Sequence, residues 1–267
     1  MQKIGICLMG LALLTMAVSA QADMTNVRPV TEVTFRPDPP VNDLQEVFNS
    51  ITNSGPGIDV GTDQTPWAVF TNDASGGPSA TMIIELADYT GTNEFGLFEF
   101  TDPSNKALVF TGGDDAGQRR LISFFANGDV DVDGTVVANN FGSLWGFYLD
   151  VYQAGVDVGG DGDPDTLDYT LYTLDSLNDG GMAQALVYRG DDQTTLEITP
   201  YMPGIFSDNE FIIAFEDLLI APGFSDRDYT DMVVLVESIT PVPAPAAFVL
   251  GLVGLGVVGV WARRHLT

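Results

Sequence analysis

The chain has 267 residues, with 37 Asp and Glu against 10 Lys and Arg, and its formal net charge is −27. A surface this acidic repels nucleic acid, so nucleic-acid binding is excluded, and self-repulsion destabilises the compact fold unless cations neutralise it. The only cysteine is Cys7 and the only histidine is His265, one near each end of the chain. We therefore expect no disulfide, no thiolate or imidazole metal site and no histidine-based catalysis in the part between them, which leaves oxygen atoms as metal ligands.

Residues 1–22 have the organisation of a secretory signal peptide. Lys3 gives a positive start, residues 4–17 are apolar, and Ala20-Gln21-Ala22 is a small-x-small cleavage site. We expect export through the inner membrane and a mature chain that begins near Asp23, with cleavage after Ala20 as the alternative. Residues 23–240 hold 7 of the basic residues and all 37 acids, so their formal charge is −30.

The mature chain begins with an expected lead-in and one predicted helix. Residues 23–41 are rich in proline and are expected to be an extended lead-in. The domain that follows covers residues 42–240. A helix is predicted at its start, with Asn42 as N-cap and Gln45 three residues on, as in a capping box. Its apolar residues recur at i, i+3, i+4 and i+7 and would face the domain: Leu44, Val47, Phe48 and Ile51.

The remainder of the domain has the pattern of β-structure. Short runs of β-branched and aromatic residues alternate with turn signals such as Asn127-Gly128-Asp129. No helix–strand alternation typical of a parallel sheet is present. The sequence predicts an all-β fold, a jelly-roll-like or related antiparallel β-sandwich with one N-terminal helix. The predicted strands cover residues 80–86, 94–100, 107–110, 121–125, 144–152, 169–173, 183–188, 211–215 and 232–237.

The first of three acidic clusters is Asp129-Val-Asp131-Val-Asp133-Gly134. It is similar to the opening of an EF-hand calcium loop, but Asn140 stands at the twelfth position, where a bidentate glutamate is required. The alternation also fits a strand whose aspartates all face solvent, and we favour that interpretation.

The second cluster lies in a glycine-rich loop from Asp157 to Asp168. Glycine lets the backbone curl, so that alternate side chains and carbonyls converge on one ion. Calcium is the abundant hard cation outside the cell, and this loop is our second calcium candidate, with a flexible acidic loop as the alternative. The candidate ligands are Asp161, Asp163, Asp165 and Asp168.

The third cluster combines two strand ends and the loop between them. Its carboxylates cannot all be charged and close together without a counter-ion. Either they fan into water or they hold a cation, and Arg227 could neutralise one of them. This cluster is the main calcium candidate, with ligands Glu216, Asp217, Asp226, Asp228 and Asp231.

Here the chain resembles a bacterial domain of unknown function that is common in secreted, calcium-rich proteins. Its motif is F-E-D, a variable loop, then D-x-D-Y-N-D and an apolar strand; the chain matches it at Phe215–Asp217 and at Asp226, Asp228, Tyr229 and Asp231. Thr230 stands where the family has asparagine, which removes either an amide ligand or a turn-stabilising bond. The resemblance extends over residues 43–239. It implies a β-rich extracellular domain whose acidic motif binds calcium, with no known enzymatic activity.

The C-terminal segment, residues 241–267, has the features of a sorting signal. Residues 246–262 are apolar and would form a helix about 26 Å long, just enough to cross a bilayer core. We predict a transmembrane helix there, with Arg263 and Arg264 at its cytoplasmic end. Together with Pro243-Ala244-Pro245, this arrangement resembles the PEP-CTERM signal of Gram-negative bacteria, with Ala244 where glutamate is commonest.

That resemblance implies an exosortase-type sorting enzyme as a partner. It also implies that the protein reaches the cell surface or the extracellular polymer matrix after its tail is processed. The alternative is an ordinary single-span membrane anchor, which likewise leaves the domain exposed at the surface.

These features favour a non-catalytic, calcium-stabilised protein with a structural or adhesive role. A carbohydrate-binding module that contacts extracellular polysaccharide is the alternative, and it would need exposed aromatic side chains. A glycosidase is a weaker alternative, because two carboxylates suffice for that reaction but a chain with 37 acids always offers some pair. The aromatic candidates are Trp67, Trp145, Tyr148, Tyr152 and Tyr201.

Overall fold

The computed structural model describes residues 28–30, 43–72, 79–84, 93–152, 167–220 and 225–242, with 79–84 as backbone only. The predicted signal peptide, most of the lead-in, the sorting motif with its apolar segment 246–262, and Asp161, Asp163 and Asp165 lie outside these ranges. Within them, no helix is both long and apolar enough to cross a membrane.

The described part contains one α-helix, α1 (Leu44–Ile51), and its predicted apolar stripe is buried. The prediction of Asn42 as its N-cap is wrong. Asp43 is the cap, because its Oδ1 accepts a hydrogen bond from the backbone N–H of Glu46 at 2.8 Å. In the first turn of a helix the backbone N–H groups have no partner within the helix, and the Asp43 side chain accepts from one of them. The helix therefore begins one residue later than predicted.

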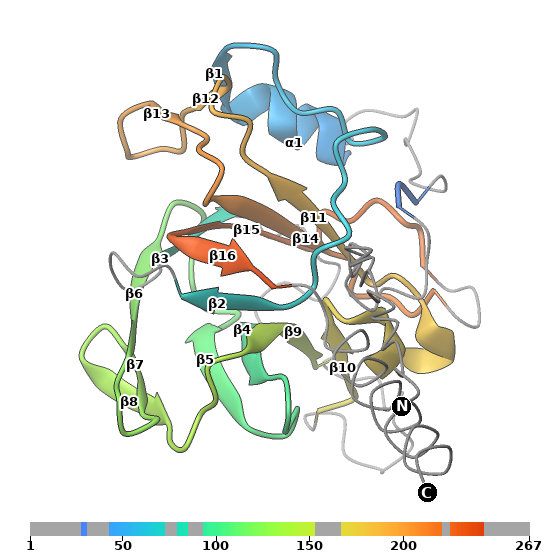
Figure 1. Cartoon of the computed structure of the whole chain (residues 1–267). Coiled ribbons are helices and arrows are strands. Elements are labelled where there is room, and N and C mark those ends of the chain that lie inside the picture. The colour runs from blue at the N-terminus through green and yellow to red at the C-terminus, as the bar shows by residue number, and fades with distance from the viewer. Residues whose placement is uncertain are drawn as a thin grey trace, which may run out of the picture. The chain divides into compact units, whose positions relative to one another are not determined.

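The described strands form three antiparallel sheets, so the all-β class is confirmed (Figure 1). The seven-stranded sheet has the order β11 (Ala185–Arg189), β14 (Phe211–Phe215), β15 (Met232–Glu237), β3 (Ser79–Ile84), β6 (Arg119–Phe124), β7 (Val130–Val132), β8 (Thr135–Ala138). The six-stranded sheet has the order β16 (Ile239–Pro241), β2 (Phe70–Asn72), β9 (Trp145–Val151), β4 (Glu94–Glu99), β5 (Lys106–Phe110), and β10 (Tyr169–Tyr172) also pairs with β9. The three-stranded sheet has the order β1 (Thr52–Ser54), β12 (Thr195–Leu196), β13 (Gly204–Ile205).

Two of these sheets pack face to face around an aromatic core. Phe95 on β4 lies 6.1 Å from Phe215 on β14, measured between ring centroids, and Phe70 on β2 lies 5.1 Å from Phe211. Inward-facing side chains of β9 fill the same core, in alternation along the strand. In this sandwich-like packing, one face of the seven-stranded sheet is buried against the six-stranded sheet.

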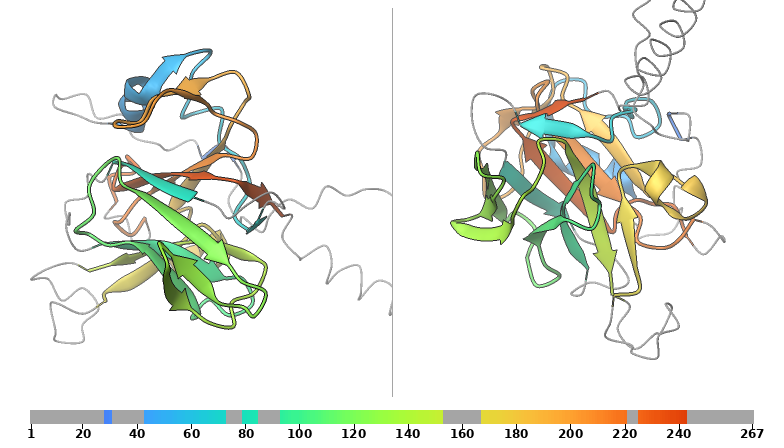
Figure 2. Two further views of the ribbon diagram at one scale, coloured as in Figure 1. Left: turned by 90° about the vertical axis from the view of Figure 1, so that its left-hand side faces the viewer. Right: turned by 60° about the horizontal axis from the view of Figure 1, so that its bottom comes forward.

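A second core covers the other face of the seven-stranded sheet. Phe48 of α1 makes an edge-to-face contact with Tyr188 of β11, with ring centroids 4.8 Å apart. Figure 2 shows the resulting layers, with the seven-stranded sheet between the helix side and the six-stranded sheet. Its inner strands β14 and β15 are therefore buried on both faces, and every residue of β14 is buried.

Two short 3₁₀ helices, η1 (Asp175–Leu177) and η2 (Asp179–Gly181), follow β10 in the chain. Asp175 forms an ion pair with Arg28 over 3.0 Å, and both side chains are buried. The backbone N–H of Val30 also donates to Oε1 of Gln64 at 2.8 Å. The described part of the expected lead-in, residues 28–30, is thus attached to the domain.

Candidate metal centre

The third acidic cluster lies at one end of the β14–β15 hairpin. The register pairs Phe215 with Met232, so the next residue on each strand, Glu216 and Asp231, extends the same pairing into the loop. The backbone N–H of Glu216 donates to the carbonyl of Gln184, just before β11. Glu216 is therefore positioned from both sides, by β15 and by the residue that precedes β11.

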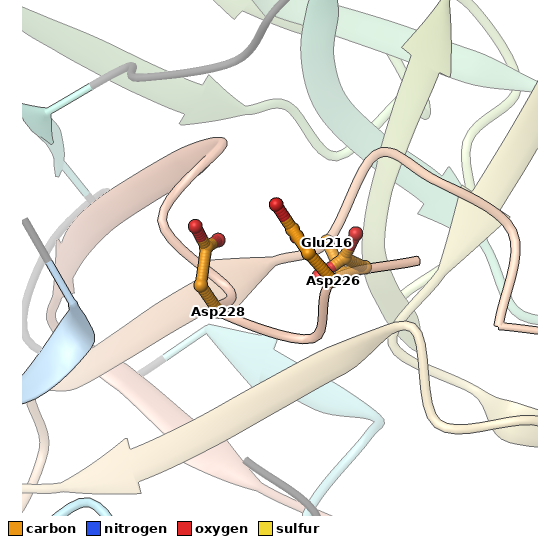
Figure 3. Close-up of side chains that lie close together, drawn as sticks. All are labelled: Glu216, Asp226 and Asp228. Carbon is orange, nitrogen blue, oxygen red and sulfur yellow. The ribbon is translucent and has the colours of Figure 1, made fainter. Parts of the chain in front are cut away.

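The structure brings the five predicted carboxylates together in two groups that share Glu216. One group is Glu216, Asp226 and Asp228, which Figure 3 shows side by side. The other is Glu216, Asp217 and Asp231, and within each group one oxygen per residue lies within 4.8 Å of the others. Ligand oxygens at about 2.3–2.6 Å from a calcium ion have this spacing, so each group can surround one ion. That they bind calcium stays a prediction.

Glu216 is the residue of the centre whose carboxylate lacks hydrogen bonds. Its side chain is 0% exposed, and neither carboxylate oxygen has a hydrogen-bond partner. The Ser225 hydroxyl and the Tyr229 N–H face it and favour its charged form, but neither meets hydrogen-bond geometry. A buried carboxylate without a partner is costly unless it is protonated or neutralised by a cation. Burial, with the nearby charges of Asp228 and Asp217, raises the pKa of Glu216 to about 7.

Asp217 and Asp231 are joined to each other by a hydrogen bond. The backbone N–H of Asp217 donates to Oδ2 of Asp231 at 2.7 Å. Burial, with the charges of Asp217 and Glu216, raises the pKa of Asp231 well above its ordinary value. Protonation or a bound cation would therefore stabilise the pair Asp217 and Asp231 relative to the state in which both are ionised without a cation.

Asn93 is a residue of the centre that sequence analysis missed. It precedes β4, is fully buried, and donates from Nδ2 to Oδ2 of Asp217 at 3.0 Å. Its amide oxygen has no hydrogen-bond partner. Because 124 positions separate Asn93 from Asp217, no local motif could have indicated this contact.

Thr230 holds the loop that carries Asp228. Both its backbone N–H and its hydroxyl donate to Oδ1 of Asp228, at 3.1 and 3.0 Å. Arg227 and Tyr229 on either side have positive φ angles of 59° and 56°, so the backbone curls around Asp228. Thr230 therefore makes a turn-stabilising bond of its own at this position.

Gln184 fixes the other side of the loop. Its amide nitrogen donates to the carbonyls of Glu216 and Leu218, at 3.1 and 3.0 Å, and its amide oxygen accepts from the Ile220 N–H at 2.9 Å. The Tyr169 hydroxyl donates to the Asp217 carbonyl at 2.6 Å. These bonds hold the carboxylates in place through the backbone, so their convergence does not depend on a cation.

The first acidic cluster forms local bonds and no group of converging carboxylates within the described chain. The expectation that its aspartates all face solvent is wrong for Asp131. That side chain is 8% exposed, because it folds over the β7–β8 turn and its Oδ1 accepts from the Gly134 N–H at 2.7 Å. Asp133 pairs with Arg120 at 3.2 Å.

Only Asp168 of the second candidate site is described. Its backbone N–H donates to the Val151 carbonyl at 3.0 Å, where β10 approaches β9. Its predicted co-ligands Asp161, Asp163 and Asp165 lie outside the described residues.

The aromatic candidates for sugar binding are divided between core and surface. Trp145 and Tyr148 are buried at 0% and 2% exposure, so they cannot form a sugar platform. Tyr201 lines a surface pocket with Arg119, whose guanidinium lies over the Tyr201 ring at 4.7 Å. One ring face of Tyr201 is therefore already covered.

Comparisons with protein families, with curated proteins and with solved structures found no match to this chain.

Proposed function

We propose that this chain is an exported, non-catalytic protein whose β-sandwich is stabilised by calcium at the third acidic cluster. Its role is structural or adhesive, at the cell surface or in the extracellular polymer matrix. The jelly-roll-like form of the sandwich, the transmembrane helix and sorting by an exosortase-type enzyme belong to the same proposal.

The state of Glu216 is the observation that supports calcium most. A fully buried carboxylate with two unpartnered oxygens stands among four aspartates, and the described structure gives it no ion pair. Such a charge costs free energy that only a proton or a cation removes. Hard cations prefer carboxylate ligands, and calcium is the one that accepts several of them in irregular geometry.

Thermal unfolding of the purified protein in excess EDTA and in millimolar calcium tests the proposal. A ligand that binds only the folded state stabilises it by about 2.7 kcal/mol at a hundredfold excess over its dissociation constant. We expect a clear rise in Tm with calcium, and magnesium should be less effective because it demands octahedral geometry.

The matched variants are Asp228→Asn in the centre and Asp115→Asn on the exposed surface. Calcium should stabilise the second as much as the wild type and the first much less. An unchanged Tm for the wild-type protein would show that no structural ion binds, and the proposal would then be wrong.

A further inference from the structure

We propose that the third cluster is a two-ion centre in which Glu216 bridges two divalent cations; this rests on the calcium binding proposed above. One ion would lie among Glu216, Asp226 and Asp228, and the other among Glu216, Asp217 and Asp231.

Spacing is the first argument for two ions. In each group of three, one oxygen per residue lies within 4.8 Å of the others, but among the described residues no four carboxylates are this close together. Ligands of one calcium ion cannot lie farther apart than about 5 Å, twice the calcium–oxygen distance. One ion therefore cannot take an oxygen from all five residues, and the geometry points to two positions.

Glu216 is suited to serve both positions. It is the one residue common to the two groups, and both of its oxygens are buried and without a hydrogen-bond partner. If a single ion bound at one group, the two aspartates of the other group would still hold like charges close together. If Glu216 bridged two ions, each of its oxygens would bind one ion, and each group of carboxylates would have a cation.

Charge balance leads to the same conclusion. Five ionised carboxylates carry a formal charge of −5, so one divalent ion would leave −3 and two would leave −1. Glu216, Asp217, Asp228 and Asp231 are all buried, and uncompensated charge there is expensive. Two ions leave a residual charge that the neighbouring Arg227 can screen.

The two halves of the centre are also built separately. Thr230 holds Asp228 by two bonds within the loop, whereas Asn93 and the Asp217 N–H hold Asp217 and Asp231 at the strand ends. Each group thus has its own set of positioning contacts, and loss of one should leave the other in place.

Counting bound calcium by native mass spectrometry tests this inference. The comparison is between the wild-type protein and a variant in which all five carboxyl groups are replaced by amides, Glu216→Gln with Asn at the four aspartates. Calcium bound elsewhere on this acidic chain contributes equally to both counts, so the difference in the number of bound ions reports the centre alone. Circular dichroism should show that the variant keeps its β-structure, because the amides remove like charges and preserve side-chain shape.

We expect the wild type to hold two more ions than this variant. A difference of one ion would overturn the two-ion centre and leave the proposed calcium binding intact, whereas no difference would overturn both. The pairs Asp226→Asn with Asp228→Asn, and Asp217→Asn with Asp231→Asn, should each lose one ion. If either pair alone abolished all the binding lost by the fivefold variant, the separate positions would be refuted.

Discussion

The backbone N–H of Asp217 donates to Oδ2 of Asp231 over 2.7 Å, at the point where the pairing of β14 and β15 ends. This bond connects the acidic centre directly to two inner strands of the seven-stranded sheet. Because these strands contribute side chains to both cores, cations at the centre would stabilise strands on which both cores depend.

Replacement of Glu216 by glutamine should have opposite effects with and without calcium. At pH 8 without metal, the variant should unfold at a higher temperature than the wild type, because a buried charge beside Asp228 and Asp217 has been removed. With calcium at a hundredfold excess, the wild type should gain about 5–10 °C and the variant much less. Differential scanning calorimetry measures both, and a variant that gains as much as the wild type would contradict the role of Glu216.

Metal-free protein should lose stability as the pH rises. The folded pKa of Glu216 is about 7, above the ordinary value of 4.5, so the folded state binds more protons than the unfolded state between these values. The free energy of unfolding contributed by this group is therefore fully present below about pH 4.5 and is lost as the pH passes 7. Asp231, whose pKa is also raised, acts in the same direction.

Urea unfolding at pH 5, 6, 7 and 8 in calcium-stripped buffer measures this dependence. Glu216→Gln should flatten it. Added calcium should stabilise most at pH 8, because ions and protons compete for the same carboxylates. A metal-free protein that becomes more stable from pH 5 to pH 8 would show that these groups are not buried as described.

Asp175→Asn should be strongly destabilising. Asp175 and Arg28 form an ion pair in which the side chains are 0% and 3% exposed, and removing one partner leaves the other charge buried. Such losses cost about 3–5 kcal/mol in unfolding free energy. The control is Asp208→Asn, which breaks the exposed pair with Arg189 and should cost less than about 1 kcal/mol. Equal effects of the two variants in urea unfolding would contradict this account.

Trp145→Ala should reduce stability and reveal nothing about sugar binding. The side chain stacks on Phe124 with ring centroids 5.6 Å apart and packs edge-on against Phe147 at 5.4 Å. Truncation of such a buried ring costs about 3–5 kcal/mol. Tyr201→Ala at the surface should leave unfolding nearly unchanged, and it is the variant with which polysaccharide retention should be tested. Retention by the wild type that Tyr201→Ala abolishes would favour the carbohydrate-binding alternative.

The main elements could be predicted because their signals are local. The apolar stripe of α1 and the nine predicted strands all correspond to observed elements, and β14 and β15 match residue for residue. The strand interpretation of the first acidic cluster corresponds to β7. Six short strands of the described chain were not predicted: β1, β2, β8, β12, β13 and β16. They have two to four residues, too few for a periodic pattern, and pairing with distant segments decides that they form strands.

The all-β class, the restriction of possible metal ligands to oxygen atoms, and the segment that holds the five carboxylates could all be inferred without a structure. These follow from composition and from residues close together in the chain. Three features depend on how the folded chain packs: Glu216 is buried without a hydrogen-bond partner, Asn93 donates to Asp217, and Trp145 lies in the core. Burial depends on which sheets pack together, and a contact across 124 positions exists only once the chain has folded.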